Sequence, residues 1–113
     1  MTDENNPNPE KDAQQIEDPL VFKLQNEVDE AQWPLLEQHY ERGALVFINE
    51  KLDLIDVAAK IVRDSVDDIK KWADEGLIYN PKESGKEVDK TTTYRFIITQ
   101  PYVLIQPKSE GSN

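Results

Sequence analysis

Aspartates are concentrated in one stretch of the chain, where neighbouring carboxylates could bind a metal ion or act as general acid and base. They are Asp53, Asp56, Asp64, Asp67 and Asp68. A calcium loop needs its oxygen ligands in the order D-x-[DN]-x-[DN]-G, and the sequence lacks that order. Capping of helix N-termini accounts better for Asp53, Asp56 and Asp68. The aspartates therefore predict helix starts, with no metal site.

Other groups that could perform catalysis are scarce. The chain has no cysteine and one histidine, His39, on an expected helix. A lone histidine without a positioned partner is more often a packing residue than a general base. The four glycines form no phosphate-binding loop, and no G-x-S-x-G run is present. We therefore predict a non-enzymatic protein with no catalytic residue, no metal and no cofactor.

Residues 66–75 carry charges at helical spacing, with Asp67, Lys70, Lys71 and Asp74 sharing one exposed face. In a helix-turn-helix protein this second helix would lie in the major groove beside phosphates. Because the stretch holds four acidic and two basic residues, we do not expect it to bind nucleic acid. A DNA-binding transcriptional regulator acting as a dimer remains the alternative. The same stripe can also be a solvated face with weak ion pairs.

The two tryptophans could stack on bases or anchor a partner. Trp72 is in register with Val66 and Ile69, so we expect it at the centre of the core. Trp33 precedes a proline at an expected helix start, and it is a candidate partner contact if it is exposed. The candidate interaction surface therefore comprises Trp33, Asp67, Lys70, Lys71 and Asp74.

Hydrophobic spacing and helix signals predict the elements that would position these residues. Helices are expected over 19–30, 34–42, 53–64 and 65–75, with a tight corner at 63–65. The apolar run 44–48 predicts a strand covered on both faces, and 79–91 a mobile loop. Strands over 92–100 and 102–106 predict a hairpin that turns at Pro101.

This order of elements is typical of an α+β, winged-helix-like fold. It combines a helix-turn-helix, a small antiparallel sheet and a C-terminal hairpin with an extra N-terminal helix. We expect residues 1–18 to be a disordered acidic tail, 19–107 the winged-helix-like domain and 108–113 a disordered C-terminal tail.

Composition bounds the class of protein. The 113 residues include 23 acidic and 13 basic side chains, a net charge of −10, and residues 1–20 hold six of the acids but one base. No apolar run approaches the roughly 20 residues that span a bilayer. The first six residues contain no basic or apolar signal segment. We therefore expect an acidic cytoplasmic protein without membrane contact.

Three runs of sequence occur in a recognisable order. They are Leu36–Leu45, which contains Arg-Gly-Ala-Leu, then Leu-Asp-Leu-Ile-Asp-Val-Ala at 52–58, and Pro-Tyr-Val-Leu-Ile-Gln at 101–106, with Trp72 before the last. Over residues 20–107 the chain thus resembles a small bacterial family of unknown function, DUF2288. It differs in a longer acidic N-terminus and in Tyr102, where the family pattern has tryptophan. The resemblance implies a bacterial, cytoplasmic protein and carries over no catalytic or binding residue.

These features together predict an acidic interaction module on a winged-helix-like scaffold. Its partner would be an unidentified protein or a second copy of the chain, with neither nucleic acid nor a membrane expected.

Overall fold

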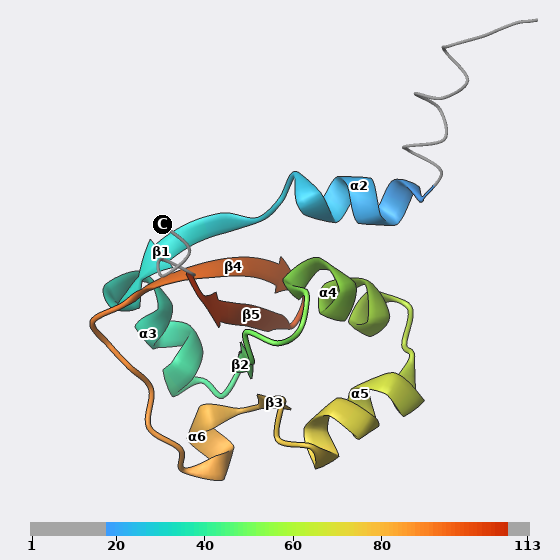
Figure 1. Ribbon diagram of the computed structural model, residues 1–113. Coiled ribbons are helices and arrows are strands. Elements are labelled where there is room, and N and C mark those ends of the chain that lie inside the picture. Colours follow the sequence, from blue (N-terminus) through green and yellow to red (C-terminus); the bar gives the residue numbers. More distant parts are fainter. Residues whose placement is uncertain (1–17, 109–113) are drawn as a thin grey trace, which may run out of the picture.

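The structure is a computed structural model that describes residues 18–108. Except for Asp18 and Lys108, the two predicted tails lie outside the described residues. Within residues 18–108 the chain forms an α+β fold of five helices and five strands (Figure 1). The elements are α2 (Pro19–Gln25), β1 (Asp29–Gln32), α3 (Trp33–Glu41), β2 (Leu45–Ile48), α4 (Leu54–Val62), α5 (Val66–Asp74), β3 (Ile78–Tyr79), α6 (Pro81–Ser84), β4 (Thr93–Thr99) and β5 (Tyr102–Pro107).

The strands form one mixed sheet in the order β1-β4-β5-β2-β3. The expected β4–β5 hairpin is confirmed, with a cis peptide bond before Pro101. The expected small antiparallel sheet is wrong, because β2 pairs in parallel with β5, Leu45 lying opposite Val103. The chain between β2 and β5 includes the α4–α5 pair, long enough for a crossover that returns the strand in the same direction. The α+β class is confirmed, and the winged-helix assignment is not.

Two segments of the sheet differ from the sequence expectation because long-range pairing overrides local propensity. The first helix ends at Gln25 instead of continuing to residue 30, and residues 29–32 pair with β4. The expected mobile loop begins with β3, which pairs with β2, and continues into α6. Asn80 caps α6 by accepting from the amide of Lys82 at 3.1 Å, and its Nδ2 donates to the carbonyl oxygen of Gly43 at 2.8 Å.

Helices cover both faces of the sheet, and each face has its own apolar cluster. Figure 1 shows α4 and α5 on one side and α3 and α6 on the other. On the α4 side, Leu54 and Val57 pack with residues from β2, β4 and β5, and Leu24 of α2 joins them. On the α3 side, Trp33 and Leu36 pack against another set of sheet residues.

The expected position of Trp72 at the centre of the core is wrong. Trp72 is only partly buried and packs against the edge of the α4-side cluster. No residue of α5 is fully buried, because this helix contacts α4 and the short edge strand β3 and does not cross the middle of the sheet. The core on that side is supplied by α4, with α5 at its margin.

Candidate functional site

Two recesses flank α4 on the same face of the sheet. One, the polar cleft, lies at the start of α4 and is lined partly by Asp53, Arg95 and Gln106. The other, the apolar groove, lies beside the end of α4 and has a volume of about 590 Å³. Its apolar lining consists of Val46, Ile61, Val66, Ile69, Ile78 and Tyr102.

The apolar groove is formed where the α4–α5 corner stands over the ends of two parallel strands. Val46 of β2 and Tyr102 of β5 form its floor, and the first residue of α5, Val66, stands on its wall. Val66 is 60% exposed and Tyr102 41% exposed. Apolar side chains of this size in a recess are a feature of interaction surfaces.

The corner that forms the groove wall has a strained residue. In α4 the amide of Asp64 donates to the carbonyl of Ile61 and the amide of Ser65 to that of Lys60, which is the Schellman ending. Helices α3 and α5 use Gly43 and Gly76 at the corresponding left-handed position, whereas Asp64 has φ of 58°. A side chain in this conformation costs roughly 1–2 kcal/mol. The corner therefore places a carboxylate on the groove wall at some cost in stability.

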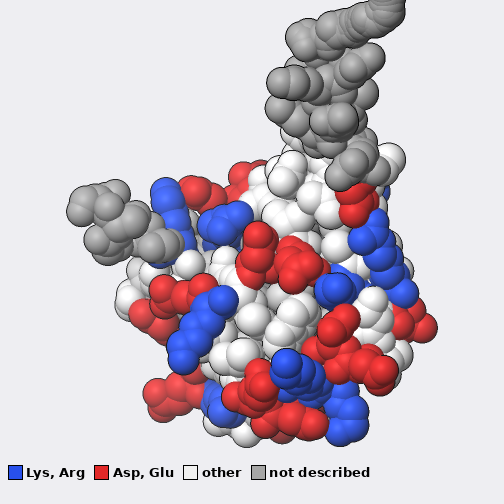
Figure 2. Space-filling view, turned by 45° about the vertical axis from the view of Figure 1, so that its right-hand side comes forward, with Lys and Arg blue, Asp and Glu red and all other residues white. Residues whose placement is uncertain are grey.

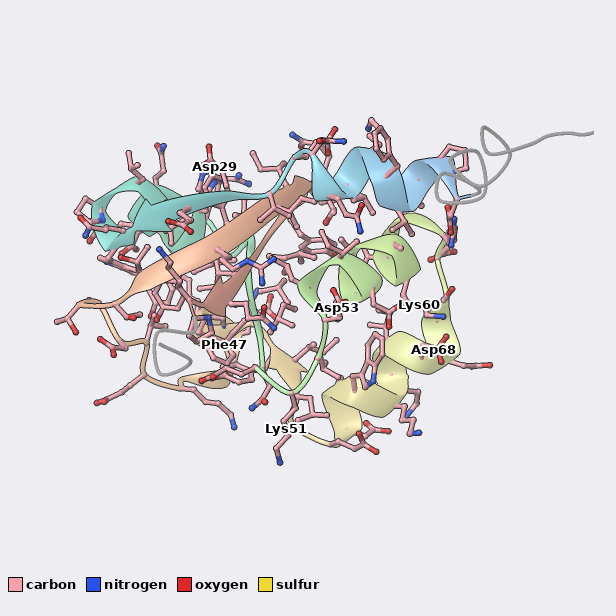
Figure 3. All side chains as sticks on the ribbon, turned by 45° about the horizontal axis from the view of Figure 1, so that its top comes forward. Asp29, Phe47, Lys51, Asp53, Lys60 and Asp68 are labelled. Carbon is pink, nitrogen blue, oxygen red and sulfur yellow. The ribbon has the colours of Figure 1, made fainter. Side chains whose placement is uncertain are left out.

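Two ion pairs border the groove. Lys60 of α4 and Asp68 of α5 face each other across the two helices, 3.5 Å between Nζ and Oδ2 (Figure 3). Along α5, Lys70 Nζ lies 3.0 Å from Asp74 Oδ2. All four side chains are at least one-third exposed, so each pair contributes roughly 0–1 kcal/mol.

Of the predicted interaction surface, the structure brings one residue to the groove. Asp67, Lys70, Lys71 and Asp74 are all exposed on α5, and Lys70 also lines the groove. Trp33 is not available as an exposed contact, because it is 6% exposed on the opposite face of the sheet. Its ring packs edge-on against Tyr40, with 5.5 Å between centroids.

Sequence reasoning missed the apolar members of the groove. The helical spacing assigned Val66 to the core, and the strand predicted over 102–106 carried no expectation about the exposure of Tyr102. Tyr102 is the first residue of β5 and Val66 the first of α5, so both stand at element ends. Position at an element end beside a predicted turn is the signal that could have identified them.

The aspartates have more than one role. Asp53 caps α4 as predicted, with its Oδ1 accepting from the amide of Ile55 at 2.8 Å. The predicted capping role of Asp68 is wrong, since Asp68 pairs with Lys60. The N-cap residue of α5, Ser65, makes no side-chain capping bond either. Within residues 18–108, no three histidine, aspartate or glutamate side chains come together as a metal site would require.

His39 lies on α3, away from the groove. Its Nδ1 is 2.7 Å from Nη2 of Arg42, and the ring is partly buried. Burial, and secondarily the positive charge of Arg42, lower the pKa of His39 below 6.5. His39 is thus a half-buried ring beside an arginine.

Charges of both signs are mixed over the surface. Figure 2 shows Lys and Arg interleaved with Asp and Glu on the side that it presents, without a continuous patch of either sign. A DNA-binding face needs clustered cations to neutralise phosphates. The visible side offers no such cluster.

Comparison with known proteins identifies the family. The family model for "Protein of unknown function (DUF2288)" matches residues 19–107, so the chain belongs to this family. Its fold is similar to the NMR solution structure of PA1075 from Pseudomonas aeruginosa, with a TM-score of 0.65 and 26% sequence identity. The similarity covers 85% of this chain and 91% of that one.

No curated protein matches the chain. Among residues 18–108, no helix combines the length and the apolar character needed to cross a bilayer.

Proposed function

We propose that this protein is a non-enzymatic interaction module that binds a second copy of itself through the apolar groove. The observation that carries the proposal is the exposure of Val66 and Tyr102 in a recess whose other large side chains are apolar. Covering such a surface contributes about 25 cal/mol per Å² of apolar area removed from water. Covering this groove therefore favours association.

The charges of the groove favour a second copy as the partner. In a two-fold symmetric contact, each residue pair across the interface occurs twice with the roles exchanged. The groove is lined by two lysines and two carboxylates: Lys60, Lys70, Asp64 and Glu83. A rotated copy can therefore place opposite charges together, although the chain as a whole has a net charge of −10. The exposed ion pairs of the two lysines are weak enough to exchange partners.

The alternative, a DNA-binding regulator, has less support. Helix α5 would have to approach the phosphates, and its surroundings carry Asp67, Asp68, Asp74 and Glu75 against two lysines. Phosphate contacts by Lys and Arg supply most of the affinity of proteins for DNA. A groove with balanced charge and an apolar floor fits a protein partner better.

Sedimentation velocity of the full chain over the micromolar range tests the proposal. We expect a concentration-dependent dimer, and we expect Val66→Asp to remove it, because the change puts a charge into the contact. The side chain at 66 is 60% exposed, so the variant should fold, as a thermal melt would verify.

Leu35→Asp is the matched control, because Leu35 is 68% exposed and lies on α3, which covers the opposite face. This variant should still form the dimer. A wild-type chain that remains monomeric throughout the range contradicts the proposal. So does an equal loss of association in both variants.

A further inference from the structure

The polar cleft at the start of α4 is the second recess of the molecule, and it is independent of the proposed self-association. Its volume is about 820 Å³, within the roughly 300–1,000 Å³ typical of small-molecule sites. The walls come from the end of α2, the loop 50–53, the start of α4 and strands β4 and β5. Four separate segments of the chain therefore meet around this space.

Gln106 fixes the geometry of the cleft. This side chain is 5% exposed, and its Nε2 donates to the carbonyl oxygens of Leu52 at 2.7 Å and Asn49 at 3.1 Å. Because both amide hydrogens of Gln106 are donated to the loop, its Oε1 is free to accept a hydrogen bond from the side of β4. It accepts from Nη1 of Arg95 at 3.4 Å. The loop, the glutamine and the arginine are thereby held in one arrangement.

Arg95 has a carboxylate on the neighbouring strand, but among residues 18–108 it forms no ion pair. On β4 it lies between Glu30 of β1 and Gln106 of β5, on the same face. Glu30 Oε1 is instead 3.2 Å from Nζ of Lys108. Within residues 18–108, no carboxylate oxygen lies within 4.0 Å of the Arg95 guanidinium. A half-buried guanidinium thus keeps most of its five donors free.

Within residues 18–108, the other charged groups of the cleft form no ion pair with Arg95. Asp53 accepts from the first amides of α4, at 2.8 Å from Ile55 and 3.3 Å from Asp56. Figure 3 shows Asp53 at the start of that helix and Lys51 extending away from the sheet. Glu50 lies in the same loop as Lys51 and is exposed. Arg95 is therefore the cation of the cleft that is held in place by the fold.

We propose that the polar cleft binds a small molecule carrying a carboxylate or phosphate group, with the Arg95 guanidinium as the binding group. The planar fork of arginine matches two oxygens of either anion, and such charge-assisted pairs are stronger than neutral hydrogen bonds. Gln106 holds the fork in position, so little side-chain entropy is lost on binding. The lining of the cleft is mainly polar, whereas that of the apolar groove is mainly apolar.

An NMR titration of the full chain with inorganic phosphate, and separately with succinate, tests this site at constant ionic strength. We expect saturable shifts at the amides of the cleft and at the Arg95 side chain in at least one titration. The anion that saturates at the lower concentration gives the class of ligand. Arg95→Gln should weaken binding roughly tenfold or more, since a hydrogen bond to a charged group contributes about 1.5–3 kcal/mol.

Arg42→Gln is the control, because it makes the same change of charge at an exposed arginine after α3. Its affinity should equal that of the wild type. The absence of saturable shifts with both anions contradicts the proposal, as does an unchanged affinity of Arg95→Gln. If that variant does not fold, Arg95→Lys replaces it. Lysine keeps the charge but lacks the fork, so it should weaken binding several-fold, and unchanged affinity would refute the role of Arg95.

Discussion

The two ends of α4 lie on one face of one sheet and yet are built from different interactions. At its start, the capping carboxylate of Asp53 and the side-chain amide of Gln106 bind backbone groups at specific positions. At its end, Val66 and Tyr102 form an apolar surface that is still open to water. The polar cleft therefore presents polar side chains held by directional bonds, whereas the apolar groove presents mainly apolar side chains.

This difference explains why the two recesses suit different ligands. A hydrogen bond of 3.4 Å to Gln106 orients the Arg95 guanidinium, whose fork can make two simultaneous contacts to a small anion. An apolar groove gains free energy from any shape that covers it, and its weak ion pairs can rearrange. Pre-organisation favours a small ligand at one end, and adaptability favours a protein at the other.

The largest expected effect is on the free energy of unfolding. It appears when a buried residue of the cleft is compared with an exposed residue of the groove. Leu54 lines the polar cleft and is 1% exposed, so Leu54→Ala should lower the free energy of unfolding by about 2–5 kcal/mol. Val66→Ala should lower it by less than about 0.5 kcal/mol, because surface substitutions outside the core have small effects. Urea unfolding measures both. Similar losses in the two variants would show that the groove end is also part of the core.

The next comparison sets the two N-caps against each other. Asp53→Ala removes a carboxylate that accepts two amide bonds of α4, and it should cost about 1 kcal/mol. Ser65→Ala should cost much less, because the Ser65 side chain makes no capping bond to α5. Thermal unfolding of the two variants checks this order. An equal cost would mean that α5 is capped in solution.

The smallest expected effect is a loss of stability at acid pH, at the groove end of α4. Arg63 Nη2 donates to Asp18 Oδ1 at 2.6 Å, and this bond is the largest of the causes that lower the pKa of Asp18 below 3.8. A carboxyl group with a lowered folded-state pKa stabilises the fold above its unfolded pKa. That contribution is lost as the pH falls through the folded pKa, below 3.8.

Arg63→Gln should therefore raise the pKa of Asp18 toward its ordinary value, as a carboxyl NMR titration would show. Asp89 is the internal reference. Its pKa is also lowered, chiefly by the hydroxyl of Thr91, and it should not change in the variant. A shift at both carboxyls would indicate a general change of structure instead of a lost ion pair.

Much of the local structure could be predicted from the sequence because it depends on neighbouring residues. Asp53 caps α4, Gly43 and Gly76 take the left-handed position after their helices, and Pro101 stands in the hairpin turn. The family resemblance rested on runs that include Asp53 and Gln106, and both residues line the polar cleft. The sequence predicted Asp53 only as a helix cap, and it marked neither residue as part of a binding site.

Tertiary contacts account for the parts that were wrong. Residues 29–32 became a strand because β4 offered a pairing edge, and Trp33 was buried by the sheet face that α3 covers. The parallel pairing of β2 with β5 depends on the long connection between these strands, which includes the α4–α5 pair. None of these contacts lies within one helical turn, so no local pattern reports them.

The sequence by itself determined the start of α4, the ends of α3 and α5, the α+β class, the family and the mixed charge of α5, because each depends on local spacing or on counting. Only the tertiary structure decided which residues line the two recesses. Arg95 and Gln106 are 11 positions apart, and Gln106 bonds to a loop 54 positions earlier. The strand register brings them together, and a strand register is set by packing over the whole sheet.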